Sequence, residues 1–500
     1  MKNIKSINIK YAILAVVMTL ASCELYREDY TEISTNDFPK TENDLKLAVN
    51  VLMYEFGTGY WNGEAIHGAN YSGYQVMSDM TTDVLWSCWG WESDVEYFQQ
   101  WQDNHTSSIS GYFDQAFAHY QFLSKARNTI RRIEASEAPE DARIHYAAEV
   151  HALRGWMGLY LYDNFGPVPV ATDAQLDDPL TYHYIGRLTE EQYDSVMTED
   201  LTYAIENLPE TAPRGRMTKG IAMTLLLKYR MMQGRFTEAE QLCRDIIALG
   251  VYNLQPDYAR IFSIDNADNN EIILCVPCNS SASWTANYMI AEVLPADMPW
   301  TDKSLGWGGY VMPWEFYNTF AHNDKRLDCV YTNYTTAAGK YVDKTNSQQL
   351  KYGALPLKYG KDPDMTGAQS GNDLIIYRYA DILLSLSECI ARNKGVNAEA
   401  EDLLNQVRRR AGLGSITGYN TDYFLEAILA ERGHEFYLEG LRRQDLIRFG
   451  KYVEYANNRI KAANATGSSY YLVDDSHNRY PIPQQYIDES KSAIEQNPGY

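Results

Sequence analysis

The chain has 500 residues, 45% of them hydrophobic, and a formal net charge of −22. That length gives room for two to four domains or for one extended repeat assembly. The acidic balance argues against nucleic acid and anionic lipid as partners, because both attract clusters of Lys and Arg.

The first 23 residues are organised like an export signal. Three lysines lie at or before the start of an apolar run at 11–20, which is too short to span a bilayer as a mature helix. The sequence Leu20-Ala21-Ser22-Cys23 follows. It resembles the lipobox of bacterial lipoproteins, in which the cysteine becomes an acylated N-terminus. We therefore predict a signal peptide at 1–22 and lipidation of Cys23; an ordinary secretory signal with a cysteine nearby is the alternative.

Cleavage at this site removes three lysines and no acidic residue, so the net charge changes from −22 to −25. Attachment to a membrane would then depend on covalent lipid. Residues 24–41 are polar, rich in acids and without a clear period, which predicts a flexible tether after Cys23. No other long uncharged apolar run follows, so we expect no membrane-spanning helix.

Six cysteines remain in the mature chain, and only Cys275 and Cys278 form a close pair. A zinc site would need a second Cys or His pair at ligand spacing, which the sequence lacks. The pair is therefore either a local disulfide or two free thiols. We predict no metal site and no cofactor.

Apolar residues recur with helical periodicity through much of the body of the chain. The segments are 109–135, 142–162, 190–207, 218–232, 236–249, 374–392, 398–411, 422–439 and 442–461. Asn397 is placed to cap the helix that starts at Ala398, and Gly250 and Gly412 each follow a helix end.

Two pairs of these helices have the plan of a tetratricopeptide hairpin. Gly234 separates one pair and Gly395 the other, and Ala239 and Ala400 put small residues in the second helices. Such hairpins stack on neighbours to bury their apolar faces, so we expect degenerate copies among the earlier helices. The predicted fold is mainly α, a tetratricopeptide-like helical repeat with a loop-rich portion carrying short strands.

Two segments depart from this pattern, at 57–103 and 267–373. Both are rich in Gly, Asn, Ser and Trp, and the run 272–276 is expected to form a strand. Long irregular segments in a folded protein usually carry function. We divide the mature body into 42–265, a loop-rich insert at 266–373, and 374–500. The irregular segments contain nine of the ten tryptophans: Trp61, Trp86, Trp89, Trp91, Trp101, Trp284, Trp300, Trp307 and Trp314.

A series of motifs along almost the whole mature chain resembles the SusD/RagB-like outer-membrane lipoproteins of the Bacteroidetes. In order they are Phe165-Gly166-Pro167-Val168-Pro169, Arg216-Met217-Thr218, Tyr377-Arg378-Tyr379-Ala380-Asp381, Glu431-Arg432-Gly433-His434-Glu435-Phe436, Tyr480-Pro481-Ile482-Pro483 and Asn497-Pro498-Gly499-Tyr500. The resemblance implies a tetratricopeptide-like fold, a location on the outer membrane facing the cell exterior, and pairing with a SusC-like TonB-dependent transporter. In such pairs the lipoprotein sits over the barrel as a lid and helps to capture glycan.

The charged residues of the C-terminal motif are better explained by structure than by catalysis. Residues three and four apart meet on a helix, where opposite charges can pair and fix a turn. Leu438 stands where a zinc peptidase helix that begins at His434 would need its second histidine, which excludes that class. No nucleophile elbow or phosphate-binding loop is present. We predict no catalytic residue and no enzyme. The residues at helical spacing are Glu431, Arg432, Glu435, Glu439, Arg442 and Asp445.

The aromatic composition points to a binding surface, with 40 Tyr and 10 Trp against 14 Phe. An indole or phenol ring can cover the apolar face of a pyranose while nearby polar groups bond its hydroxyls. We predict ligand contacts from Trp86, Trp89 and Trp91 with Asp83, and from Trp284, Trp300 and Trp307. Trp61, Trp101 and Trp314 are assigned to the core. Asn287, Asp297 and Asp302 are the polar groups expected beside the second cluster.

Together these features predict a surface lipoprotein that binds an oligosaccharide or polysaccharide and delivers it to a SusC-like transporter. The alternatives are a peptide or protein receptor, a mainly structural lid of the transporter, and a surface hydrolase.

Overall fold

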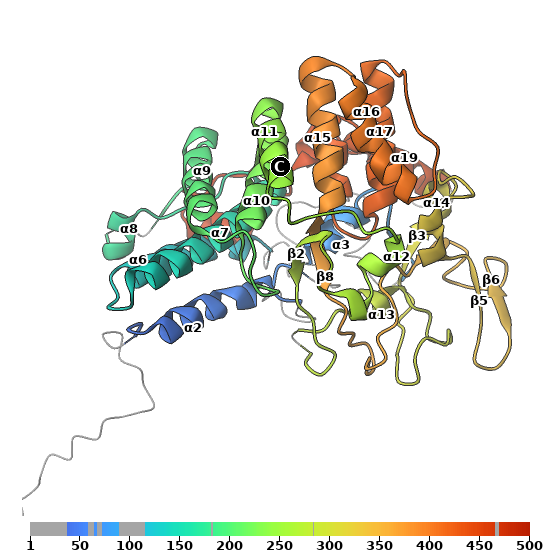
Figure 1. Cartoon of the computed structure of the whole chain (residues 1–500), viewed down its shortest axis with the longest axis horizontal. Coiled ribbons are helices and arrows are strands. Elements are labelled where there is room, and N and C mark those ends of the chain that lie inside the picture. Colours follow the sequence, from blue (N-terminus) through green and yellow to red (C-terminus); the bar gives the residue numbers. More distant parts are fainter. Residues whose placement is uncertain are drawn as a thin grey trace, which may run out of the picture.

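The computed structural model describes residues 38–58, 65–67, 73–89, 116–181, 184–283, 285–465 and 470–500 (Figure 1). The predicted signal peptide, Cys23 and most of the tether lie outside these ranges. Four of the tryptophans named above also lie outside them: Trp61, Trp91, Trp101 and Trp284.

Helices dominate the N-terminal half of the chain (Figure 1). The 26-residue α7 is its central element and packs against α2, α6, α9 and α10. The helices of this half are α2 (Glu42–Met53), α3 (Tyr74–Met80), α6 (Tyr120–Glu134), α7 (Glu140–Phe165), α8 (Asp173–Asp177), α9 (Glu190–Asn207), α10 (Lys219–Met232) and α11 (Phe236–Ala248).

The two predicted hairpins form and stack on each other. Gly234, with φ of +71°, joins α10 to α11, and Gly395, with φ of +79°, follows α15 (Tyr379–Lys394). The side chain of Asn397 accepts a hydrogen bond from the Ala400 N–H and so caps α16 (Ala398–Arg410). Because α11 packs against α15, the two hairpins belong to one repeat assembly. This confirms the mainly helical, tetratricopeptide-like fold.

Two sequence-based helices are wrong in part. The predicted helix at 374–392 begins as a strand, β8 (Leu374–Arg378), because this buried apolar run pairs with β2 (Ile272–Val276), the strand expected at 272–276. The predicted helix at 442–461 is two helices, since Gly450 with φ of +65° separates them. The C-terminal helices are α17 (Thr421–Phe436), α18 (Arg442–Arg448), α19 (Tyr452–Ala465) and α20 (Gln484–Glu489).

The loop-rich portion contains short strands, which lie below the hairpin helices in the view of Figure 1. A four-stranded antiparallel sheet has the order β1 (Trp86–Ser87), β3 (Tyr310–Pro313), β7 (Gly353–Pro356) and β4 (Val330–Tyr331). β5 (Asn333–Thr335) and β6 (Tyr341–Asp343) form a hairpin, and β2 pairs with β8. Short helices α12 (Tyr258–Ile261), α13 (Met289–Val293) and α14 (Trp314–Tyr317) lie among them. Cys275 and Cys278 are free thiols.

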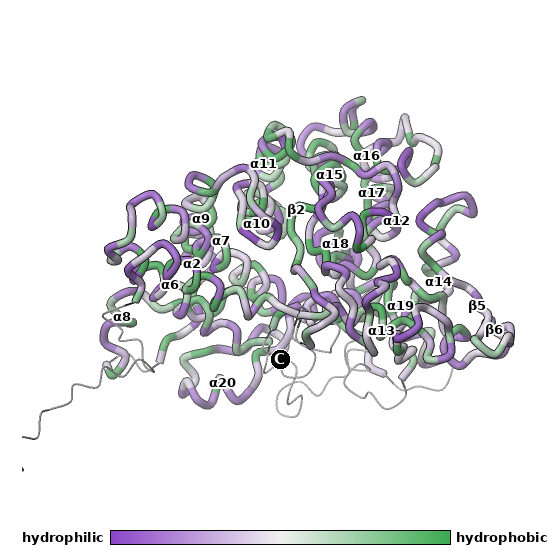
Figure 2. The backbone as a smooth tube through the Cα atoms, turned by 60° about the horizontal axis from the view of Figure 1, so that its bottom comes forward, coloured by the Kyte–Doolittle hydropathy of each residue, from purple (hydrophilic) through white to green (hydrophobic). Residues whose placement is uncertain are grey.

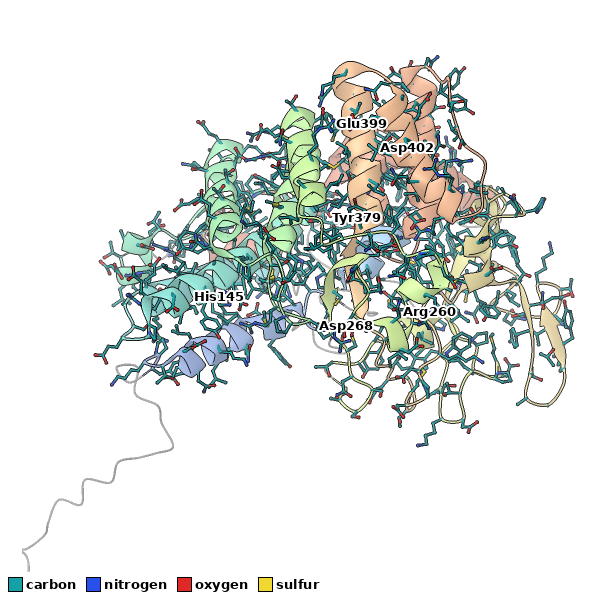
Figure 3. All side chains as sticks on the ribbon, in the orientation of Figure 1. His145, Arg260, Asp268, Tyr379, Glu399 and Asp402 are labelled. Atoms are coloured by element: carbon teal, nitrogen blue, oxygen red, sulfur yellow. The ribbon has the colours of Figure 1, made fainter. Side chains whose placement is uncertain are left out.

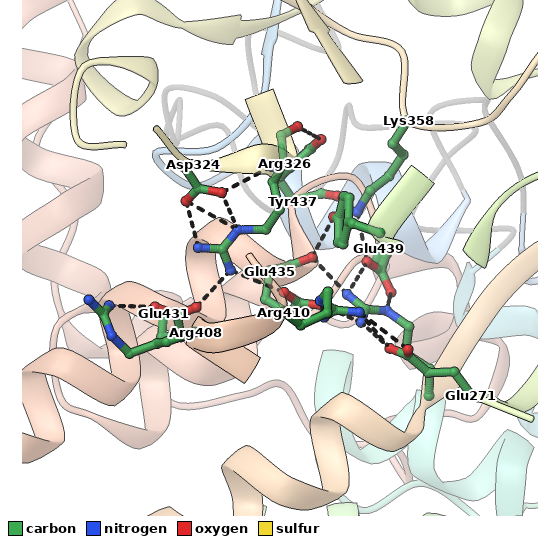
Figure 4. Close-up of polar contacts among 12 residues, drawn as sticks. Glu271, Asp324, Arg326, Lys358, Arg408, Arg410, Glu431, Glu435, Tyr437 and Glu439 are labelled. Carbon is green, nitrogen blue, oxygen red and sulfur yellow. Dashed lines mark hydrogen bonds and ion pairs between the residues drawn. The ribbon is translucent and has the colours of Figure 1, made fainter. Parts of the chain in front are cut away.

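A buried network of charges joins the loop-rich portion to the C-terminal helices (Figure 4). Arg326 donates to Glu431 at 2.7 Å and to Glu435 at 3.0 Å, and Arg378 donates to Glu439 at 2.9 Å and to Glu271 at 2.8 Å. Arg378 and Arg410 also bond to Glu435. The motif around Glu435 therefore has the structural position expected of it. Its partners come from other segments rather than from its own helix; Arg432 pairs with Asp445 of the neighbouring helix at 442–448, at 2.8 Å.

The network keeps the Glu435 carboxylate ionised although it is buried. Burial alone would raise the pKa of Glu435, but Arg410, Arg378 and Arg326 hold that pKa well below its usual range. Lys358, which donates to Glu439 at 2.7 Å, has its pKa lowered by burial to about 8. Breaking such a network leaves unpaired buried charges, so it fixes the relative positions of the segments that supply it.

In Figure 2, hydrophilic and hydrophobic residues are interspersed along the helices. This is the pattern of helices that bury one face against their neighbours. Among the described residues, none of the helices combines the length and the hydrophobicity that crossing a bilayer requires.

Candidate ligand-binding surface

The two tryptophan-rich regions meet where β1 pairs with β3. Trp86 lies opposite Val311 and Ser87 opposite Tyr310, and the Cys88 N–H donates to the Gly309 carbonyl at 2.8 Å. A segment of the first region thereby becomes an edge strand of a sheet built mostly from the second. This pairing places the segment that carries Trp86 and Trp89 beside the segment that follows Trp307, which the sequence could not show.

Trp89 packs across the backbone at Gly309. A Cβ atom at that position would lie 2.3 Å from the indole, so only glycine allows this contact. The ring centroid is 5.4 Å from that of Tyr310, which is buried. Trp89 itself is half-buried. Trp89 is therefore fixed by its packing on Gly309 and Tyr310 and remains partly exposed.

Trp307 has the geometry of a stacking platform. Its ring is parallel to that of Tyr288, with an angle of 9° and a centroid distance of 5.9 Å, and the backbone N–H of Trp307 donates to the Ala291 carbonyl at 2.7 Å. Gly306 lies against the Leu294 carbonyl, where a Cβ would approach to 2.0 Å. The indole is half-buried. A ring that is fixed by packing and remains partly exposed suits a flat apolar ligand face.

A hollow of about 270 Å³ opens beside Trp307. Tyr334 at its wall donates to Asp297 at 2.6 Å, and burial, followed by that bond, raises the pKa of the Tyr334 phenol. Gln349 donates to the carbonyls of Val293 at 2.7 Å and Tyr310 at 3.2 Å. The other polar residues of the hollow are Lys340, Asn346, Ser347 and Gln348. Carboxylate, amide, ammonium and hydroxyl groups thus surround one edge of the Trp307 platform.

Sequence reasoning named Asp297 as a residue of this surface but missed Tyr288, Tyr334 and Lys340. The last two come from the β5–β6 hairpin and the turn within it. The signal available was two short runs rich in Tyr, Thr and Val, at 331–336 and 341–342, with Gly339 between them, which is typical of a hairpin.

Trp86 and Asp83 are engaged by arginines of the C-terminal helices. The Arg459 guanidinium carbon is 4.3 Å from the Trp86 ring centroid, and burial lowers the pKa of Arg459 to about 10. Asp83 accepts two hydrogen bonds from Arg442, at 2.8 and 2.9 Å. Because both Asp83 oxygens are used in this pair, the carboxylate has a structural task in addition to the ligand contact expected of it.

Trp300 lies beneath the surface, with 7% of its area exposed. The Tyr331 ring meets it edge-on at 6.0 Å, the Lys361 ammonium is 5.1 Å from its centroid, and its Nε1 has no hydrogen-bond partner among the described residues. This position makes Trp300 a support for the surrounding loops. Trp314 donates from Nε1 to the Leu350 carbonyl at 2.8 Å, as a structural residue does.

The remaining predicted residues divide between the core, the surface and the undescribed ranges. Asn287 is buried, with its amide donating to the Asn372 carbonyl at 3.1 Å, whereas Asp302 is exposed. Trp91 and Trp284 lie outside the described residues. The described ranges contain no group of three or more His, Cys, Asp or Glu placed to hold a metal ion.

Known proteins resemble this chain in sequence and in architecture. A model of the SusD family matches residues 270–500. SusD-like protein P2 from Formosa agariphila is 23% identical over 98% of this chain and 99% of its own length. The starch-binding protein SusD from Bacteroides thetaiotaomicron is 24% identical over 74% of this chain and 75% of its own length.

The solved structures agree with the sequence relatives. Surface glycan-binding protein A from Bacteroides thetaiotaomicron, in complex with laminarihexaose, superposes with a TM-score of 0.74 at 24% identity, over 92% of this chain and all of that one. Residues 270–500 thus match the SusD family, and the chain as a whole has the SusD-like fold. In this SusD-like fold the hairpin helices form the scaffold; Trp307 lies in the loop-rich portion and Trp89 in the segment that pairs with it.

Proposed function

We propose that this protein captures an oligosaccharide or polysaccharide on the surface around Trp89 and Trp307. The observation that carries the proposal is the Trp307 ring. It packs parallel to the Tyr288 ring and borders a hollow lined with polar groups. A pyranose presents C–H bonds on its faces and hydroxyls around its edge. The flat ring and the adjacent polar hollow match those two kinds of surface.

The relatives support a glycan rather than another ligand. One curated relative is named a starch-binding protein, and the superposed glycan-binding protein holds a laminari-oligosaccharide. The ligand class proposed is therefore a glycan with pyranose units.

Binding without cleavage is the activity that the hollow supports. A glycosidase needs two carboxyl groups on either side of the scissile bond, about 5 Å or roughly 6.5–9.5 Å apart. Among the described residues that line the hollow, Asp297 is the only acid, and its Oδ1 accepts a hydrogen bond from Tyr334. We therefore propose a binding protein and not an enzyme.

We further propose that the protein is anchored by lipid at Cys23, faces the cell exterior, and passes its glycan to a SusC-like TonB-dependent transporter. The lipobox-like sequence supports the anchor. The SusD family match supports the partner. In this arrangement the tether at 24–41 would let the body move while it stays attached.

Affinity electrophoresis and calorimetry on a polysaccharide panel that includes laminarin and starch test the proposal. The wild-type protein should bind at least one polysaccharide, and Trp307→Ala should weaken that binding at least ~10-fold, because stacking residues at the centre of a site dominate its affinity. Tyr423→Ala is the matched control, since Tyr423 is 63% exposed on α17 and no part of this surface.

The thermal midpoint of each variant shows whether it is folded. If no polysaccharide binds to the wild-type protein, the proposed ligand class is wrong. Equal binding by folded Trp307→Ala would instead show that the glycan site lies elsewhere.

A further inference from the structure

The stretch at 331–361 is basic, unlike the chain as a whole. It contains five lysines and one acid, Asp343, which gives a local charge of +4 in a chain whose net charge is −22. Lys358 is buried and donates to Glu439 at 2.7 Å. The other four lysines are exposed: Lys340, Lys344, Lys351 and Lys361. The same stretch supplies more than half of the residues that line the hollow beside Trp307.

The four exposed lysines have no anionic partner in the described part of the chain. None of their ammonium groups lies within 4.0 Å of a carboxylate there. Three of them lie against aromatic rings, in the pairs Lys344–Trp314 at 5.4 Å, Lys351–Tyr352 at 4.6 Å and Lys361–Trp300 at 5.1 Å. A cation–π contact leaves the positive charge uncompensated. The stretch therefore presents a positive potential beside the hollow.

Lys340 lines the same hollow as Trp307 and follows a fixed turn. The Thr336 N–H donates to the Lys340 carbonyl at 2.9 Å, and the Lys340 N–H donates to the Thr336 hydroxyl at 3.1 Å. Gly339, with φ of +81°, completes this turn, and a Cβ there would meet no atom within 4 Å. The β5–β6 hairpin that contains the turn projects from the edge of the molecule (Figure 3). The Lys340 backbone is thus held in place at a position open to solvent.

The acids of the hollow and the hairpin are engaged in hydrogen bonds of their own. Asp297 accepts from the Tyr334 hydroxyl at 2.6 Å. Asp343 accepts from the N–H and the hydroxyl of Thr345, at 2.9 and 2.6 Å. Neither carboxylate is within ion-pair distance of Lys340. A ligand that reaches the hollow therefore meets an ammonium group that no acid of the described chain neutralises.

We propose that the glycan bound here is acidic: a pyranose stacks on Trp307, and its carboxylate or sulfate group forms an ion pair with the Lys340 ammonium. This inference rests on the proposed function, because it assigns a chemical class to the glycan of that same surface. A lysine ammonium is a compact charge without a fixed fork, so it suits either anion. Lys344 and Lys351 lie within two residues of the lining segment at 346–349 and add to the positive potential.

Calorimetry of the full mature chain with matched pairs of polysaccharides tests this class. One pair is polygalacturonate and its fully methyl-esterified form, and the other is carrageenan and its desulfated form, so the two pairs distinguish carboxylate from sulfate. The acidic member of at least one pair should bind at least ~10-fold more tightly than its uncharged form. That preference should fall at least ~3-fold between about 50 and about 500 mM NaCl, because salt screens the ion pair.

Three variants locate the charge that is responsible. Lys340→Gln should weaken binding of the acidic polysaccharide at least ~10-fold and remove most of its salt dependence, whereas Lys340→Arg should stay within ~3-fold of wild type. Lys46→Gln is the matched control and should bind like wild type. Lys46 is also exposed and without an ion pair, and its helix α2 lies at the opposite side of the molecule in Figure 1. The thermal midpoint shows that each variant is folded.

The possible failures are distinguishable. If laminarin, starch or the uncharged forms bind as tightly as the acidic ones, the proposed glycan capture stands and the acidic class is wrong. Unchanged binding by folded Lys340→Gln would also overturn this inference, and would leave Lys340 the role of preventing other strands from pairing with an exposed hairpin. If no polysaccharide binds at all, the proposed function fails and this inference fails with it.

Discussion

Glycine at 309 and aspartate at 79 show how single residues shape this molecule. Gly309 is required because the Trp89 indole occupies the space of its Cβ, and it thereby places one aromatic ring of the proposed site. Asp79 is buried and accepts hydrogen bonds from the N–H groups of Gly440 and Arg442, at 3.1 and 3.3 Å. It thus ties α3 to the start of α18 across more than 350 positions of sequence.

Asp79 should make the stability of the protein depend on pH. Burial raises its pKa from an ordinary 3.8 to about 7, against the effect of the two backbone donors. Between these values the folded state holds a proton that the unfolded state has released, so this residue lowers stability as pH rises from about 4 to about 7. The free energy of unfolding of Asp79→Asn, relative to wild type, should therefore increase by ~1.4 kcal/mol per pH unit across that window.

Chemical denaturation at pH 4.5, 5.5, 6.5 and 7.5 measures this difference. The exposed Asp422 on α17 provides a matched control, in which Asp422→Asn should give no such slope. A constant difference for Asp79→Asn over the same range would mean that Asp79 is ionised in the folded protein throughout.

At the scale of elements, the strongest constraint is the charge network that α17 shares with the loop-rich portion. Glu435 forms ion pairs with Arg326, Arg378 and Arg410, and each of these arginines is nearly or completely buried. The cost of desolvating these groups is offset only while all of them are present.

Glu435→Ala should therefore destabilise the protein strongly, by ~3–5 kcal/mol, because it leaves several buried arginines without their shared acceptor. Thermal and chemical unfolding measure the loss. Glu426→Ala is the control, since Glu426 is exposed on the same helix and should change stability by less than ~0.5 kcal/mol. A small effect of Glu435→Ala would show that the network rearranges around the missing carboxylate.

The elements that sequence patterns predicted well are those held by local interactions. The helix at 190–207 and the cap at Asn397 match the structure because periodicity and capping are properties of neighbouring residues. The predictions failed where distant contacts decide. Leu374–Arg378 is a strand because β2 pairs with it, and no local signal distinguishes a buried strand from the first turns of a buried helix.

The candidate site shows the same division. The sequence predicted the residue type and the two regions, and both stay predictions; the contact between Trp89 and Gly309 and the parallel arrangement of Trp307 and Tyr288 depend on tertiary packing. Trp300 is buried and Trp307 is half-buried, although both are tryptophans in the same loop-rich segment.

At the scale of the whole molecule, the helical scaffold and the proposed binding surface lie in different parts of the fold. Stacked hairpins form one side, and the short strands and loops that carry the tryptophans form the other (Figure 1). The net charge is −22, so the attraction of such a protein to a membrane surface must come from something other than basic residues.

The proposed anchor can be tested on the complete protein in its own cells. Metabolic labelling with a fatty acid should label the wild-type protein, and Cys23→Ala should abolish the label. Cys88→Ala, which alters a half-buried cysteine of the folded body, is the control and should remain labelled. The mature chain starting at residue 24 should still bind glycan in solution. Label retained in Cys23→Ala would show that acylation occurs elsewhere.

The pairing of β1 with β3 also sets the order in which the protein can assemble. The bonds between Cys88 and Gly309 join residues 221 positions apart in the chain. Contacts of such long sequence separation form late, because a large loop must close before they are gained. The aromatic surface therefore cannot be complete until the chain as far as Gly309 is available to fold. Sugar recognition would begin only after the scaffold is in place.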